Sequence, residues 1–250
     1  MSPMVSAMNM INNRLKTKYC IQSLLLLLLL TAVSISHAAN VLVHAINFSD
    51  QPEGDARPWF LENGYLMKLD SDDIELTFKN KQLNLKTSKS KAGIFGLTLK
   101  PENHLADITS IEIEWGVIKQ PQGANWDAEN NRLAIAFMFF FGTEEIGSGL
   151  PFGINSAPYF LSPFIGQNEK VGKVYMGKLY KEGGRYICVA VTKGSDNLIK
   201  STFKIDPRYL KIFDKDKIPP ITGIAFQMNT RDTKGGAHAF IRKLSFYSDK

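Results

Sequence analysis

The sequence predicts an all-β protein, a two-sheet antiparallel β-sandwich of the jelly-roll, galactose-binding-like type. Apolar residues occur in runs of strand length or alternate with polar residues, which is typical of strands with one buried face. Glycine, proline, asparagine and aspartate separate these runs, and such residues favour turns. No segment has the length and apolar spacing of a helix that crosses between parallel strands. We therefore expect a single sandwich domain over residues 39–250.

Alternation of apolar and polar residues predicts the strands of the first half. Within 74–78, Ile74, Leu76 and Phe78 point to one face of a strand, and the polar residues between them point to the other. Within 110–118 every second residue is likewise apolar. Strands are predicted over 41–48, 74–78, around Leu83 and Leu85, and over 94–99 and 110–118.

The second half begins with a strand of a different kind. Residues 133–141 are apolar on both faces, which predicts a strand in the middle of a sheet that is covered on each side. Residues 173–180 and 185–191 flank a pair of glycines at 183 and 184, and this arrangement predicts a hairpin.

The remaining segments complete the expected sandwich. Residues 150–166 are apolar but interrupted by three prolines, which predicts a lid or the cover of a sheet edge. Residues 206–211 predict one helical turn. The last two strands are predicted over 221–229 and 237–247, and we expect the final one to form a sheet edge.

Residues 1–38 have the order of a secretory signal peptide. Basic residues precede an apolar run with seven consecutive leucines, and no acidic residue occurs in this segment. Ser36 and Ala38 are the small residues at positions −3 and −1 of a cleavage site before Ala39. The apolar run, 24–35, is shorter than the roughly 20 residues that a membrane-spanning helix needs. We expect cleavage, a periplasmic or secreted protein, and no membrane span in the mature chain.

Charge and cysteine content exclude several classes of protein. The formal net charge is +6, and the three basic residues of the leader contribute part of it. The other basic residues form no concentrated stripe, so no nucleic-acid partner is expected. Cys188 is the one cysteine after residue 38, which excludes an intramolecular disulfide in the mature chain. Its apolar neighbours predict a buried thiol.

Several motifs between residues 92 and 247 occur in a characteristic order. They are Ile113-Glu114-Trp115, the segment 127–132, Pro158-Tyr159-Phe160, the segment 206–213, and the neighbouring segments 219–225 and 229–235. In this order they resemble a family of secreted, mostly proteobacterial proteins known as a domain of unknown function. The chain departs from the family at Arg231, where an acidic residue is usual, and at Ile113, where a tryptophan is usual. The resemblance implies a sandwich that looks like carbohydrate-binding modules, without an agreed activity.

The polar loop Asn229–Gly236 is the candidate ligand site. It places amide, hydroxyl, carboxylate and guanidinium groups between two apolar strands, and a polyol or carboxylate ligand needs such groups for directional hydrogen bonds. An exposed tryptophan in a loop can stack on a sugar ring, although it can also close an end of the core, and the polar loop itself can be a simple turn. The predicted ligand-binding residues are Asn229, Arg231, Asp232, His238, Trp126 and Arg132.

A structural calcium ion is the alternative role of this loop. Asp232 would bind the ion together with Asp50 or Asp55 from the first loop and with backbone carbonyl groups. The histidines have no partner at zinc-binding spacing, so no other metal or cofactor is predicted.

No catalytic residue is assigned. Glu112 and Glu114 share one strand face, as the catalytic pair of some glycosidases does, but a third carboxylate is missing there and a solvent-exposed face explains the pair. Serine-hydrolase and nucleotide-binding motifs are absent from the sequence. We expect a non-catalytic binding or accessory protein for a glycan or another small polyhydroxy ligand. A glycan-active hydrolase or lyase and a structural envelope protein are the alternatives, and the oligomeric state stays open.

We predict that export removes the leader, because basic, apolar and small residues follow one another in the required order. Intact-mass measurement of protein from the periplasmic fraction should give a chain that starts at Ala39. A chain that starts at or before Met10 and sediments with membranes would contradict this prediction.

Overall fold

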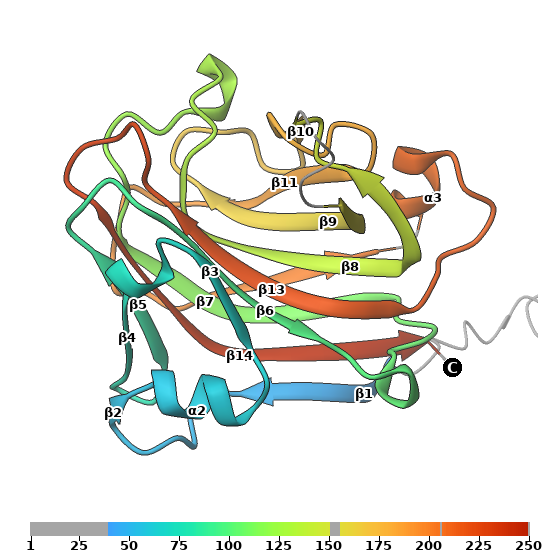
Figure 1. The fold of residues 1–250 in the computed structure, drawn as a ribbon, viewed down its shortest axis with the longest axis horizontal. Helices are drawn as coiled ribbons and strands as arrows, with labels where there is room; N and C mark the ends of the chain where they lie inside the picture. Colours follow the sequence, from blue (N-terminus) through green and yellow to red (C-terminus); the bar gives the residue numbers. More distant parts are fainter. Residues whose placement is uncertain (1–39, 151–155, 206, 250) are drawn as a thin grey trace, which may run out of the picture. The chain divides into compact units, whose positions relative to one another are not determined.

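Two seven-stranded sheets make up this computed structural model, which describes residues 40–150, 156–205 and 207–249 (Figure 1). Sheet A contains β1 (Asn40–Asn47), β2 (Gly54–Asp55), β4 (Glu75–Phe78), β5 (Leu83–Thr87), β7 (Ser110–Lys119), β12 (Ile199–Lys204) and β14 (Ala237–Asp249). Sheet B contains β3 (Leu66–Leu69), β6 (Ala92–Thr98), β8 (Leu133–Gly147), β9 (Ser156–Gly166), β10 (Val174–Met176), β11 (Gly184–Val191) and β13 (Ile221–Asn229). The short helices are α2 (Arg57–Glu62), α3 (Arg208–Phe213) and the 3-10 turns η1 (Ser71–Asp73), η2 (Pro101–Asn103) and η3 (Trp126–Ala128).

Neighbouring strands are mostly antiparallel. Sheet A has the order β12-β7-β14-β5-β4-β2, and β1 pairs with the remaining length of β14. Sheet B has the order β10-β11-β9-β8-β13-β6-β3. In the described part of the chain, the pairing of β9 with β11 is the one parallel ladder. The predicted all-β sandwich of two sheets is confirmed.

Alternation along the strands builds the core between the sheets. The alternating apolar residues of β7 that face the core are 0% exposed: Ile111, Ile113, Trp115 and Val117. The ring of Trp115 lies 5.4 Å from the ring of Phe137 on β8, so the two sheets meet at this contact. The Trp115 indole N–H donates to the Ser201 hydroxyl at 3.1 Å, and the buried donor is therefore satisfied.

β8 lies between β9 and β13, which confirms the prediction of a strand in the middle of a sheet. Phe137 and Phe139 belong to the core between the sheets. Met138 faces the other way and packs with Phe160 and Ala225 in a separate apolar cluster on the outer face of sheet B. β8 is thus covered on both faces, as its continuous apolar run requires.

Residues 156–166 form β9, so the prediction of a lid or edge cover is wrong for them. The prolines at this position suggested an irregular segment, because a proline has no N–H for a ladder. At Pro163 the neighbouring Ser162 hydroxyl donates to the Phe137 carbonyl oxygen at 2.5 Å, which supplies a hydrogen bond to β8 there. The remaining part of the segment, 151–155, lies outside the described residues.

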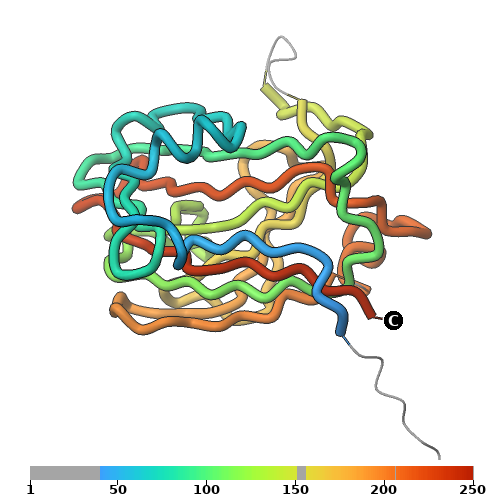
Figure 2. Tube along the Cα trace, turned by 90° about the horizontal axis from the view of Figure 1, so that it is seen from below, coloured from blue at the N-terminus to red at the C-terminus, as the bar shows by residue number. Residues whose placement is uncertain are grey.

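The expectation that the last strand forms a sheet edge is also wrong. β14 pairs with β7 along one side and with β5 and then β1 along the other. Figure 2 shows β1, from the start of the domain, alongside the second half of β14. Ile241 lies on the face of β14 that belongs to the core. Phe240 lies on the opposite face and is also buried, at 1% exposed. A strand that is buried on both faces belongs inside a sheet.

Other predictions about local structure are confirmed. β10 and β11 form the expected antiparallel hairpin, with β10 shorter than predicted, and α3 supplies the helical turn near residues 206–211. Cys188 is 0% exposed. Burial disfavours its thiolate and raises the pKa of this thiol to about 11. No helix in the described residues has the length and apolar character needed to cross a membrane.

Gly236 is expected to be essential for the connection between β13 and β14. Its φ is +65°, and a Cβ atom there would lie 1.9 Å from the Thr87 carbonyl oxygen. Gly236→Ala should therefore strongly lower the melting temperature or prevent folding. Gly147→Ala is the control, because nothing lies within 4 Å of a Cβ atom at that position. Equal melting temperatures of the two variants, measured by circular dichroism, would contradict this turn.

Candidate functional site

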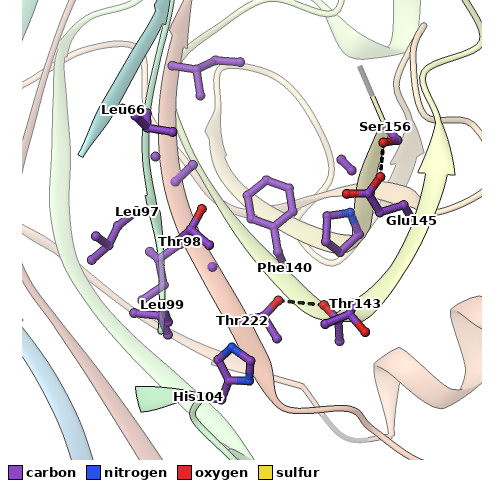
Figure 3. Close-up of a pocket in the computed structure, with 18 of the residues that line it drawn as sticks. Leu66, Leu97, Thr98, Leu99, His104, Phe140, Thr143, Glu145, Ser156 and Thr222 are labelled. Atoms are coloured by element: carbon purple, nitrogen blue, oxygen red, sulfur yellow. Dashed lines mark hydrogen bonds between the residues drawn. The ribbon is translucent and has the colours of Figure 1, made fainter. Parts of the chain in front are cut away.

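A hollow of about 420 Å³ opens on the outer face of sheet B (Figure 3). Residues of β6, β8 and β13 form its floor. Its walls come from β3, from the segment that follows β6, and from the paired end of β8 and start of β9. The hollow therefore lies at the end of sheet B where β13 begins.

Small residues on neighbouring strands create this hollow. Gly96 lies opposite Ala225 in the ladder of β6 and β13, and Gly223 lies opposite Phe140 in the ladder of β13 and β8. A Cβ atom at Gly223 would come within 3.3 Å of the Phe140 ring. Because Gly223 has no side chain, the Phe140 ring can lie close to the sheet. Larger residues at positions 96 and 223 would fill the hollow.

Phe140 provides the aromatic surface of the hollow. Its side chain is half-buried, and Figure 3 shows its ring in the middle of the lining residues. A tilted contact with Phe160, at 5.6 Å between ring centroids, fixes the ring from one side. Leu66 and Ile94 add aliphatic surface, so the floor and one wall are apolar.

Polar groups stand around this apolar floor. Glu145 and Ser156 come from the paired ends of β8 and β9, and the Ser156 hydroxyl donates to the Glu145 carboxylate. Thr98 and His104 stand on the side of β6, as Figure 3 shows, and Lys68 comes from β3. The rim therefore offers hydroxyl, carboxylate, imidazole and ammonium groups to a ligand.

Five of the predicted ligand residues meet at the opposite end of sheet B. The Arg132 guanidinium donates to the Arg231 carbonyl oxygen at 2.6 Å and lies 2.5 Å from the Asp232 carboxylate. The Asn229 side-chain oxygen accepts the Arg231 backbone N–H at 3.2 Å. The Trp126 indole N–H donates to the Arg132 carbonyl oxygen at 3.1 Å. The fold thus joins residues that are 100 positions apart in the sequence.

The charged groups of this cluster are paired with one another. The Arg231 guanidinium lies 2.9 Å from the Asp70 carboxylate, and Arg132 holds Asp232. Hydrogen bonds from Arg231 and Arg132 hold the pKa of Asp70 and Asp232, respectively, below the usual range. These pairs connect the β13–β14 loop with β8 and with the end of β3, which favours a structural role for the loop.

Trp126 requires a correction as a residue that stacks on a ligand. It is 6% exposed, and its ring lies 5.1 Å from that of Phe164 and 5.6 Å from that of Tyr175. Because neighbouring rings cover it, no face of the indole is open to a sugar. The alternative expectation, that Trp126 closes part of the core, fits its burial.

His238 lies apart from the cluster, although it follows the same loop. One of its ring nitrogens is 3.3 Å from the Asn84 side-chain oxygen, across the ladder of β14 and β5. Burial and, to a lesser extent, the charge of Lys86 lower the pKa of His238. It therefore contacts sheet A instead of the residues that were predicted to share its site.

Asp50 and Asp55 are not brought to Asp232. Asp50 accepts the Asn47 amide N–H at 2.7 Å, and Asp55 accepts the Arg57 backbone N–H at 3.0 Å. β2, which contains Asp55, and the β13–β14 loop lie apart in Figure 1. Within the described residues, no group of three or more histidine, cysteine, aspartate or glutamate side chains could hold a metal ion. The structure does not assemble the predicted calcium ligands.

Glu112 and Glu114 lie on the outer face of sheet A. The Glu114 carboxylate is 3.0 Å from the Lys200 ammonium, and Glu112 accepts the Tyr247 hydroxyl at 3.3 Å. These contacts fit the solvent-exposed polar face that the sequence favoured.

Sequence reasoning missed the hollow. Gly96 and Gly223 were the available signal, because a glycine inside a strand often marks a place where another group approaches closely. Their meaning depends on which strands are neighbours, and the order of β6, β13 and β8 is a tertiary property.

No protein-family model and no curated protein matches the chain, so the resemblance to a secreted family of unknown function stays a prediction. The chain is similar to solved structures of family 29 carbohydrate-binding modules. One from Piromyces equi has 9% identity and a TM-score of 0.36, over 82% of this chain and 90% of that chain. A mutant module in complex with mannohexaose has 10% identity and a TM-score of 0.35, over 75% and 83%. Both TM-scores are below 0.5, so these similarities say nothing about the function of this chain.

The Arg132–Asp232 pair is expected to act as one unit. The Arg132 side chain is 14% exposed, so Asp232→Ala should leave a largely covered guanidinium without its ion-pair partner and lower the melting temperature. In the Arg132→Ala variant, adding Asp232→Ala should lower the melting temperature by less than it does in the wild type, because the ion pair is already absent. Glu62→Ala, which removes an exposed carboxylate on α2, is the control. Additive losses in thermal melts would contradict the pairing.

Proposed function

We propose that this protein is an exported, non-catalytic binding module that holds a glycan or another polyhydroxy compound in the hollow on sheet B. The observation that carries this proposal is the combination of an apolar floor with a polar rim in one open hollow. The export part rests on the leader predicted over residues 1–38, which lie outside the described residues.

A sugar ring matches this combination of surfaces. The ring has apolar C–H faces and carries its hydroxyl groups around the edge. Phe140 and Leu66 offer apolar surface to such a face, while Thr98, His104 and Ser156 offer hydrogen-bond donors and acceptors at the rim. The volume of about 420 Å³ lies within the range of small-ligand sites.

The lining favours binding over hydrolysis. Among the described residues of the hollow, Glu145 is the single carboxylate. Most glycoside hydrolases use two carboxyl groups, roughly 5 to 9.5 Å apart, on either side of the bond that they cleave. The next residue towards the N-terminus, Glu144, pairs with Lys215 at 3.1 Å. One free carboxylate can orient a ligand but cannot provide both the acid and the nucleophile or base.

A purely structural role is disfavoured by the open space on sheet B. In a structural protein we would expect side chains to fill this face. Instead, Gly96 and Gly223 leave the floor uncovered, and Leu66 at the wall is 56% exposed. Exposed apolar surface of this kind often marks a place where a ligand binds.

Phe140→Ala should weaken glycan binding about tenfold or more, because removing a central aromatic contact commonly costs about 1 to 2 kcal/mol of binding free energy. Isothermal titration calorimetry with neutral oligosaccharides of glucose, mannose, xylose and N-acetylglucosamine measures the effect. Leu42→Ala is the matched control, because Leu42 is an apolar residue, 51% exposed, on the other sheet. If no saccharide binds the wild type, or if both variants bind equally well, the proposed site is wrong.

A further inference from the structure

Glu145 presents an unneutralised carboxylate to the hollow. The Ser156 hydroxyl donates to one of its oxygens, which fixes the orientation of the group. Figure 3 shows the other oxygen directed towards the side of the hollow that contains the Phe140 ring. Within the described residues, Glu145 forms no ion pair, so its charge is available to a ligand.

Comparison with the neighbouring Glu144 shows that the lack of an ion pair is specific to the position of Glu145. β8 and β9 continue past the floor as a two-stranded ribbon in which Glu145 lies opposite Pro158. Glu145 lines the hollow, whereas Glu144 lines a separate depression, where Lys215 neutralises it at 3.1 Å. In the part of the chain that the structure describes, a lysine thus pairs with one carboxylate of this ribbon and none pairs with the other.

The other ionisable groups of the lining come from different walls. Lys68 is exposed and comes from β3, and His104 is half-buried and follows η2. In Figure 3, His104 and Glu145 lie towards different ends of the hollow. A ligand can therefore place one of its groups against the Glu145 carboxylate. The oxygen atoms of the same ligand can then lie near Lys68 and His104.

A ligand ammonium group is the best partner for this corner of the hollow. A hydrogen bond between an ammonium and a carboxylate is roughly twice as strong as one between neutral groups. Phe140 lines the same hollow, on the side towards which a Glu145 oxygen is directed in Figure 3, so its ring would add a cation–π attraction that a neutral amide or hydroxyl lacks. An open carboxylate next to an aromatic ring is therefore better suited to a cationic ligand than to a neutral one.

We propose that the hollow prefers polyhydroxy ligands that carry a primary ammonium group, such as oligomers of glucosamine, and that Glu145 determines this preference. This inference rests on the function proposed above and specifies the class of ligand for the same site.

The test compares the tetramers of glucosamine and N-acetylglucosamine, which differ at one group on each ring: an ammonium in the first and a neutral, larger acetamide in the second. Calorimetry at pH 6 and low salt should show at least about tenfold tighter binding of the glucosamine tetramer to the wild type, as expected for a charge-assisted contact. Glu145→Gln should remove this difference and change the affinity for the N-acetylglucosamine tetramer by less than about twofold. Glu144→Gln is the matched control and should keep the difference. Thermal melts verify that both variants are folded.

The possible outcomes separate this inference from the proposed function. Equal affinity of the wild type for both tetramers would overturn the ammonium preference, and a difference that Glu145→Gln retains would overturn the role of Glu145 in it. The proposed function would survive either result if neutral oligosaccharides still bind in a way that depends on Phe140. Failure of every saccharide to bind would overturn both. If Glu145→Gln loses the difference in affinity between the tetramers and Glu144→Gln keeps it, the result supports the ammonium preference and the proposed function.

Discussion

The packing of aromatic side chains between the two sheets is the interaction on which the rest of the structure depends. Phe226 on β13 contacts Phe60 of α2, Phe95 of β6 and Phe137 of β8, with ring centroids 5.3 to 6.0 Å apart. Burial of each such side chain is worth about 1.5 to 3 kcal/mol, so these contacts strongly fix β13 relative to its neighbours. Because residues alternate along a strand, fixing Phe226 inward places Gly223 and Ala225 outward, on the floor of the hollow.

The opposite end of sheet B is held by polar contacts. The Arg132–Asp232 and Arg231–Asp70 pairs connect the β13–β14 loop to the residue before β8 and the residue after β3. Thr230 is 0% exposed, and its hydroxyl donates to the Lys89 carbonyl oxygen at 2.8 Å. The polar groups of such a loop can bind a ligand or can form hydrogen bonds and ion pairs with the rest of the protein. In the β13–β14 loop they mostly form contacts within the protein.

The two glutamates at the end of β8 show how the fold gives different roles to similar residues. Glu144 and Glu145 are adjacent, so their side chains point to opposite sides of the ribbon. One side faces Lys215 and the ring of Tyr159, and the other faces the hollow beside Phe140. The first carboxylate is paired with a lysine, and the second forms no ion pair within the described residues.

The sequence predicted most of the longer strands and their inward faces, because both depend on local alternation, but it did not predict β2, β3 or β12. Ile111, Ile113 and Trp115 were placed in the core by their spacing, and the structure buries all three. The run 133–141 likewise predicted an inner strand, because two apolar faces require two covers. Two further errors arose because local sequence signals did not show which strands would become neighbours. Prolines suggested an irregular segment at β9, and the end of the chain suggested an edge at β14.

Sequence alone therefore determined the class of fold, the composition of the core and the buried state of Cys188. It also identified the residues of the β13–β14 loop as a group that belongs together. Only the tertiary structure decided that Arg132 neutralises Asp232, that Asp50 and Asp55 lie elsewhere, and that Gly96, Gly223 and Phe140 surround one hollow. The physical reason is that burial and strand alternation depend on residues that are close in the sequence, whereas a binding site depends on which distant strands become neighbours.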